Sequence, residues 1–160
     1  MFLCAVFVLE PNQFVHIKGC VIVREILFRG KRIDNGKWIY GFPVPSVGLD
    51  AGKWLITAIQ GNAISSSTYA VDAATIGEFT GLYDIYGVMI FEGDIVRHGY
   101  TCKYSDGKTA NFFSNMPVSF SSNYGGWIIG DCNILTTKNI KKYSIEVIGN
   151  IYDTEKNHGR

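Results

Sequence analysis

Residues 76–96 read IGEFTGLYDIYGVMIFEGDIV, and this stretch decides the fold. Two short apolar runs, residues 89–91 and 95–96, are separated by the triplet Glu-Gly-Asp at 92–94. Glycine adopts a positive φ at little cost, and an aspartate side chain can accept a hydrogen bond from the nearby backbone. The triplet therefore predicts a tight turn that leads into a strand, and residues 84–87 predict a second turn.

The residues predicted to form these turns are acids, glycines and one threonine. Glu92 and Asp94 are interpreted as residues that solvate and fix their turn, the alternative being a carboxylate pair for acid/base or metal chemistry. The structural interpretation is favoured because such sites need convergent partners, and the nearby His98 is a lone histidine after a strand, which is usually just a polar end. We therefore expect no catalytic residue, metal site or cofactor. The full turn set is Thr80, Gly81, Asp84, Gly87, Glu92, Gly93 and Asp94.

Three blocks of the sequence resemble one family. The run 77–96 resembles the signature of the YopX family of bacteriophage and prophage proteins, in which TGL, an Asp and a Gly precede an (I/V)-(F/Y)-E-G-D-I-V block. Residues 24–41, REILFRGKRIDNGKWIYG, are similar to its N-terminal block, and residues 146–153, EVIGNIYD, to its C-terminal block. The resemblance implies a fold and a phage context, but no established reaction.

The chain departs from the family pattern at the second turn. The family usually has a polar residue or Lys on either side of the turn glycine, whereas this chain has Ile85, Tyr86 and Val88. A turn this apolar predicts a contact surface.

Composition indicates one packed, β-rich domain without a dominant charge. The chain has 160 residues, 47% of them apolar and 14% aromatic, and its net charge is +1. This balance gives no global field that would attract nucleic acid or an anionic membrane. We expect residues 23–153 to form the family domain and residues 154–160 a polar tail. Residues 1–22 lie outside the resemblance, as a mis-annotated start or an extra strand.

The N-terminal run and the cysteines exclude several other classes of protein. The apolar run in residues 1–22 lacks a basic region and is stopped by Glu10 and Pro11, so neither a signal peptide nor a membrane span is expected. The cysteines show no C-x-x-C spacing, and the histidines are scattered, which argues against a zinc or redox motif. We expect reduced thiols and a location in the cytoplasm of a bacterial host.

The segment 24–41 predicts a β-hairpin with a basic surface. Ile26 and Phe28 alternate with Leu27 and Arg29, and Asn-Gly at 35–36 is a strong hairpin signal. Its basic and aromatic residues could bind single-stranded nucleic acid, but we favour a solvated outer face beside two core aromatics. These residues are Arg24, Arg29, Lys31, Arg32, Lys37, Trp38 and Tyr40.

The remaining elements follow from apolar runs and turn signals. We expect strands at 53–59, 69–71, 118–120 and 127–129, an Asp-Gly hairpin that joins 100–104 to 109–113, and a long last strand at 143–152 with a bulge at Gly149. Short helical turns are expected within 72–75 and 135–141, and loops at 42–52 and 60–68.

Together these patterns predict an all-β or β-dominated fold, a small barrel with SH3-like elements built from hairpins. The favoured function is that of a non-catalytic accessory protein that binds a host protein or forms a homo-oligomer. The alternative is nucleic-acid binding by the hairpin at residues 24–40. No membrane partner is expected.

Overall fold

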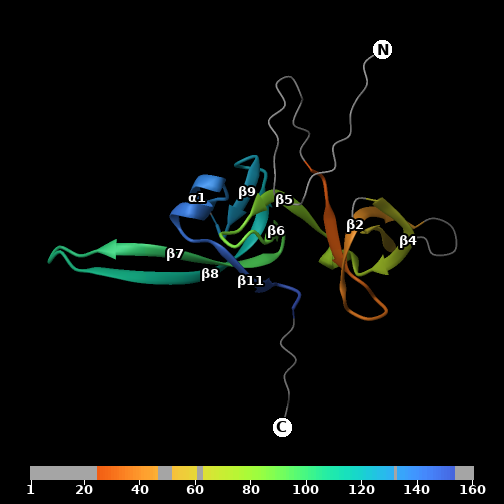
Figure 1. The fold of residues 1–160 in the computed structure, drawn as a ribbon, viewed down its shortest axis with the longest axis horizontal. Coiled ribbons are helices and arrows are strands. Elements are labelled where there is room, and N and C mark those ends of the chain that lie inside the picture. Colours follow the sequence, from red (N-terminus) through yellow and green to blue (C-terminus); the bar gives the residue numbers. More distant parts are fainter. Residues whose placement is uncertain (1–24, 47–51, 61–62, 132, 154–160) are drawn as a thin grey trace, which may run out of the picture.

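The computed structural model describes residues 25–46, 52–60, 63–131 and 133–153. They form two antiparallel sheets that lie side by side along the long axis of the molecule (Figure 1). The six-stranded sheet has the order β4 (Ala63–Val71), β3 (Trp54–Gln60), β2 (Trp38–Pro45), β1 (Phe28–Lys31), β5 (Gly77–Tyr83) and β6 (Met89–Phe91). The five-stranded sheet has the order β10 (Asn133–Ile134), β9 (Gly126–Ile129), β8 (Thr109–Ser121), β7 (Asp94–Lys103) and β11 (Glu146–Asn150).

The β-dominated class is confirmed, but the prediction of a barrel is wrong. A barrel requires the two outer strands of a sheet to pair with each other, and neither sheet closes in this way. β4 and β6 stay at opposite edges of the first sheet, and β10 and β11 at opposite edges of the second. The apolar faces of the two open sheets are therefore buried by packing against other elements, and not by closure of a sheet into a barrel.

Local turn signals placed the hairpins correctly. The Asn-Gly turn joins β1 to β2, with Gly36 at φ 68°, and the Asp-Gly turn joins β7 to β8, with Gly107 at φ 83°. The turn between β6 and β7 contains Gly93 at φ 80°. The expected bulge in the last strand is present, because the pairing of β11 with β7 shifts register between Val147 and Gly149.

Both short helical turns are confirmed. The 3-10 turn η2 (Ala73–Thr75) is capped by Asp72, whose side chain accepts a hydrogen bond from the Ala74 amide. Helix α1 (Thr137–Lys142) is capped by Thr136, whose side chain accepts from the Asn139 amide. No helix in the described ranges is long and apolar enough to cross a membrane.

Several strand boundaries were predicted wrongly, because cross-strand pairing decided them instead of local composition. The expected polar link at 60–68 belongs mostly to β4, a Ser/Thr-rich edge strand paired with β3. The expected loop at 42–52 starts only after Pro45, since β2 reaches that residue. β8 is one strand of 13 residues where two were expected, and β11 is shorter than the expected 143–152.

Two apolar clusters meet at strand β6. Neighbouring residues of a strand point to opposite faces, so Ile90 and Phe91 enter different clusters. Phe91 packs with Leu27 and Phe79, where the Phe79 and Phe91 ring centroids are 5.4 Å apart. The larger cluster joins the second sheet to α1 and consists of Ile90, Val96, Val118, Trp127, Ile129, Leu135, Ile140 and Ile145.

A buried ion pair joins the two sheets beside Phe91. Arg29 of β1 donates from Nη2 to Oδ1 of Asp94, the first residue of β7, over 2.5 Å, and both side chains are buried. The guanidinium lies over two rings, 4.5 Å from the Trp38 centroid and 4.6 Å from that of Phe91. Arg29 was expected on a solvated face, so that interpretation is wrong for this residue. The pattern had nevertheless placed it on the same face as Leu27, which is also buried.

Asp94 accepts further hydrogen bonds that fix its turn. Its Oδ2 accepts from the Phe91 amide at 2.8 Å, and the Asn150 side chain approaches Oδ1 at 3.4 Å. Burial raises the pKa of Asp94, while Arg29 and these donors act in the opposite direction. Asp94 therefore fixes the turn as expected, but it is buried and not solvated.

The network also connects the three sequence blocks. Arg29 comes from the block 24–41, Asp94 from 77–96 and Asn150 from 146–153. Next to it, Lys31 donates to the Tyr152 carbonyl at 2.6 Å and lies 2.8 Å from the Asp153 carboxylate. The blocks are thus parts of one polar junction between the sheets.

Substitution of Arg29 by Met should destabilise the protein strongly. Removal of one partner of a buried ion pair leaves the other charge uncompensated, which costs about 3–5 kcal/mol. Urea denaturation should show this loss. The double variant Arg29→Met, Asp94→Asn should recover part of it, because no unpaired charge then remains. Lys37→Met, on the exposed tip of the same hairpin, is the control and should change the free energy of unfolding by about 0.5 kcal/mol or less. Equal effects of Arg29→Met and Lys37→Met would contradict the account.

Candidate functional site

The turn between β5 and β6 is fixed by one buried carboxylate. Asp84 Oδ1 accepts hydrogen bonds from the amides of Tyr86 and Val88, at 2.8 and 2.9 Å. Its Oδ2 accepts from the Val147 amide of β11 at 3.0 Å. Gly87, at φ 82°, completes the turn by donating to the Asp84 carbonyl. One side chain thereby sets the shape of the turn and attaches it to the second sheet.

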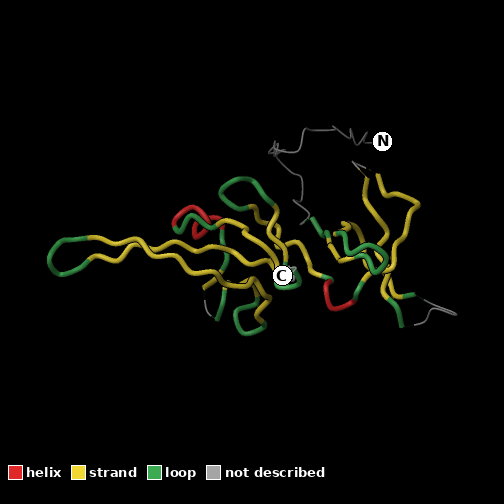
Figure 2. Tube along the Cα trace, turned by 90° about the horizontal axis from the view of Figure 1, so that it is seen from below, coloured by secondary structure: helices red, strands yellow, loops and turns green. Residues whose placement is uncertain are grey.

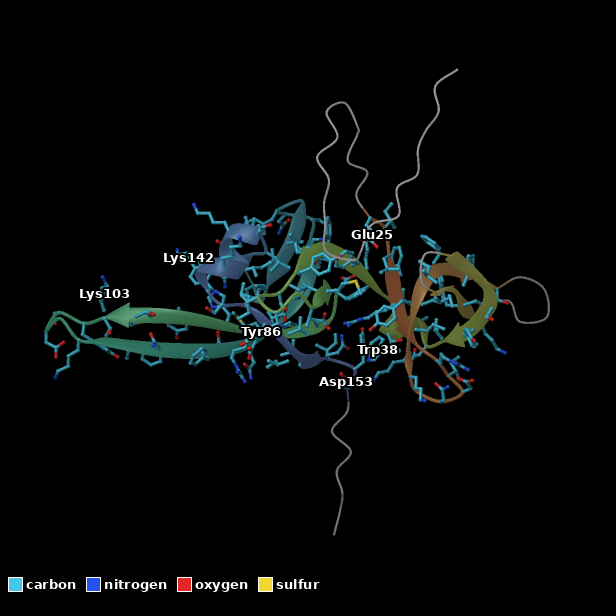
Figure 3. The ribbon with its side chains drawn as sticks, in the orientation of Figure 1. Glu25, Trp38, Tyr86, Lys103, Lys142 and Asp153 are labelled. Atoms are coloured by element: carbon cyan, nitrogen blue, oxygen red, sulfur yellow. The ribbon has the colours of Figure 1, made fainter. Side chains whose placement is uncertain are left out.

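The apolar side chains of this turn point outward. Ile85 is 40% exposed, Tyr86 73% and Val88 48%, and we refer to these three residues as the apolar turn (Figure 3). The Ile85 amide also donates to the Ile145 carbonyl at 3.1 Å. Because the backbone is held by hydrogen bonds on both sides, the exposed side chains are presented from a preorganised support.

The other residues of the turn set hold the neighbouring strands and turns in position. Thr80 is buried, and its hydroxyl donates to the Ile90 carbonyl at 2.8 Å. Gly81 has φ 78°, and the Gly93 amide donates to the Val118 carbonyl at 2.9 Å. The Glu92 amide donates to the Glu78 carbonyl. These residues therefore place strands and turns.

The structure separates the basic residues of the first hairpin. Arg29 lies in the core, and Lys31 contacts Asp153. Arg32 forms an ion pair with Asp34 and stacks over the Tyr69 ring at 4.0 Å. These three cations thus lie close to acids or aromatic rings of the same chain.

The remaining members of that set are arranged differently. Lys37 is exposed at the hairpin tip, whereas Trp38 is half-buried beneath Arg29. Tyr40 is partly exposed and packs against Phe91, with centroids 5.6 Å apart. Arg24 lies outside the described residues. Nucleic-acid binding by this hairpin stays a prediction.

A groove beside α1 was missed by the sequence analysis. It has a volume of about 560 Å³ and runs between the projecting part of the β7–β8 hairpin and the end of the helix. The alternation of Tyr100 with polar neighbours was a usable signal, but only the strand register shows that Phe112 faces it. Its lining residues are Gly99, Tyr100, Thr101, Asn111, Phe112, Phe113, Lys142, Tyr143 and Ser144.

The fold and the turn together define a class of protein: a β-dominated domain in which two antiparallel sheets meet at a buried ion pair and present an apolar turn. The family model described as YopX protein matches residues 27–156, most of the chain. The chain belongs to the YopX family. A comparison with curated proteins finds no match.

Substitution of Asp84 by Ala should open the apolar turn and loosen β11. Three backbone amides would lose their acceptor, and a buried unsatisfied group costs about 1–3 kcal/mol. We expect a loss of about 3 kcal/mol in urea denaturation, with Asp84→Asn intermediate.

Asp106→Ala provides the matched control. Asp106 caps the Asp-Gly turn in the same manner, accepting from the Lys108 amide at 3.0 Å, but its side chain is solvent-exposed. Its loss should cost about 1 kcal/mol or less. If Asp84→Ala were as mild as this control, Asp84 would not be the residue that fixes the turn.

Proposed function

We propose that this YopX-family protein is a non-catalytic binding module that makes protein contacts through the apolar turn. The observation that carries the proposal is the combination of exposed Ile85, Tyr86 and Val88 with a backbone fixed by buried Asp84. Exposed apolar groups on a rigid support lose little conformational entropy on binding, so more of the burial energy becomes affinity.

Two of the three acidic residues of the family motif, Asp84 and Asp94, support a structural role. Asp84 accepts from three backbone amides, and Asp94 is engaged by Arg29 and the Phe91 amide. A general base or a metal ligand needs a lone pair directed toward substrate or metal. Both carboxylates are instead occupied within the fold, which favours binding over catalysis.

A second copy of the chain is the partner we propose first. The apolar turn carries no charge of its own, and Ile148, next in sequence to the Val147 that Asp84 holds, is also partly exposed. A self-complementary apolar contact about a two-fold axis would cover such a surface on both copies. A host protein is the second candidate, in keeping with an accessory role in a phage or prophage within the bacterial cytoplasm.

Exchange of Ile85 and Tyr86 for Lys should lower the assembly state while the fold stays intact. Burial of one large apolar side chain contributes about 1.5–3 kcal/mol, which corresponds to about a 10- to 100-fold change in dissociation constant. Light scattering after size exclusion should give a wild-type mass that is a multiple of 17.8 kDa, and a lower mass for the variant.

Tyr124→Lys is the matched control. Tyr124 is an exposed tyrosine in the turn between β8 and β9, away from the apolar turn in sequence. It should leave the mass unchanged, and the wild-type assembly should persist at high salt because apolar contacts are not screened. A wild-type monomer at all salt concentrations would show that self-assembly is wrong, and an unchanged mass in the Lys variant would exclude the apolar turn as the interface.

A further inference from the structure

The hairpin formed by β7 and β8 projects far beyond the body of the protein. Figures 1 and 2 show its end as an arm that no other described element covers. Pairing continues along it from Gly99 opposite Phe113 to Lys103 opposite Thr109. A two-stranded ribbon is only marginally stable by itself in water. The stability of the fold therefore does not explain why the hairpin projects so far.

One face of the arm continues the apolar core outward. Val96 lies in the core, and the same strand face then carries His98 and Tyr100, since alternate residues share a face. Tyr143, just after α1, covers His98, with ring centroids 4.4 Å apart. Tyr100 lies two residues further along the strand than His98, opposite its cross-strand partner Phe112.

Beyond that point the arm exposes a stacked pair of rings. Tyr100 and Phe112 lie with centroids 5.5 Å apart and planes at 20°, and they are 43% and 39% exposed. Phe113, the neighbour of Phe112, adds a third ring that is 65% exposed, but it projects from the opposite face of the strand. All three line the groove of about 560 Å³. Flat rings exposed in this way present stacking surfaces to a ligand.

The backbone allows the groove to form beside the end of α1. The Gly99 amide donates to the Tyr143 carbonyl at 2.8 Å, which ties the base of the arm to the segment after the helix. A Cβ at position 99 would lie 3.2 Å from both the Phe113 ring and the Tyr143 carbonyl. Glycine thus permits this close approach of strand, ring and helix end.

Lysine side chains lie near the aromatic rings of the groove. Lys142 lines the groove, with its ammonium 4.6 Å from the Tyr143 centroid and 2.8 Å from the Tyr143 hydroxyl. Lys103 on the arm and Lys142 extend toward the same side of the ribbon in Figure 3. Residues 97–146 hold six of the fifteen basic residues and three of the fourteen acidic ones, so the rest of the chain is net negative.

Two of those acids are already paired. Asp106 contacts Lys108, and Glu146 contacts Arg97. Within the part of the chain that the structure describes, no ion pair joins Lys103, Lys141 or Lys142 to an acid. These cations are available to an anionic ligand.

We infer that this aromatic groove binds single-stranded nucleic acid. Bases would stack on Tyr100 and Phe112, which share one face of the ribbon, while phosphates would lie near Lys142 and Lys103. Stacking requires only a flat π face, and cations attract any phosphate, so recognition is tolerant of sequence. None of the residues that line the groove belongs to the apolar turn or to the first hairpin.

Fluorescence anisotropy with a short labelled oligothymidylate tests this inference. The wild-type protein should bind it, and binding should weaken as salt rises. Tyr100→Leu and Phe112→Leu, which remove a ring but keep apolar volume, should each weaken binding about tenfold. Lys142→Gln should reduce the slope of log affinity against log salt by about 0.7, the value for one phosphate contact to a single strand.

Phe120→Leu is the matched ring control, because Phe120 lies exposed on β8 but outside the groove. It should bind like wild type, and urea denaturation of each variant would show that the fold is retained. Heparin, a polyanion without bases, should bind equally well to wild type and Tyr100→Leu.

Four results would overturn the inference: no binding of the oligonucleotide, equal losses for Phe120→Leu and the groove variants, equal losses of heparin and oligonucleotide in Tyr100→Leu, or a loss with Arg32→Ala that the groove variants do not share. The last would place the site on the first hairpin. A change of oligomeric mass in the groove variants without oligonucleotide binding would instead show that the groove contacts a second copy.

Discussion

The ion pair between Arg29 and Asp94 is the interaction on which the rest of the fold depends. Transfer of two charges out of water costs several kcal/mol for each ion, so such a pair persists only with good geometry and additional partners. Here the guanidinium lies against Trp38 and Phe91, and the carboxylate also accepts from the Phe91 amide. One of these two rings, Phe91, also belongs to the smaller apolar cluster.

Because replacement of a buried ion pair by apolar residues is often neutral or stabilising, we propose that this pair serves to align the two sheets. An apolar junction would allow the two sheets to slide against each other, whereas Arg29 and Asp94 define one alignment of β1 with the start of β7. Lys31 makes a comparable contact closer to the surface, with the Tyr152 carbonyl and the Asp153 carboxylate after β11. The family blocks therefore coincide with the residues that set the relative position of the sheets. The outward-facing residues of the apolar turn and the arm take no part in this junction, and they are the positions for which we propose binding.

Local signals predicted part of this structure and could not predict the rest. Asn-Gly and Asp-Gly placed two hairpins, because glycine conformation is a property of the residue itself. Closure and strand length depend on partners distant in sequence, which is why residues 63–68 of β4 were predicted as part of a link and a barrel was expected. Arg29 shared a strand face with Leu27, yet its burial became clear only once Asp94 was placed beside it. The apolar turn was recognised from three apolar residues within a four-residue stretch of sequence, whereas the groove needed the register that brings Phe112 opposite Tyr100.

Native-state hydrogen exchange is the most direct test of the claim that the ion pair makes the sheets one cooperative unit. The amides of Asp72 and Phe79 report on the first sheet, and those of Gly93 and Gly130 on the second, since each donates within the fold. The account predicts that all four open with free energies within about 1 kcal/mol of each other, and that they fall together in Arg29→Met. It would be contradicted if the first sheet opened at a clearly lower free energy than the second in the wild-type protein, or if Arg29→Met lowered protection in one sheet alone.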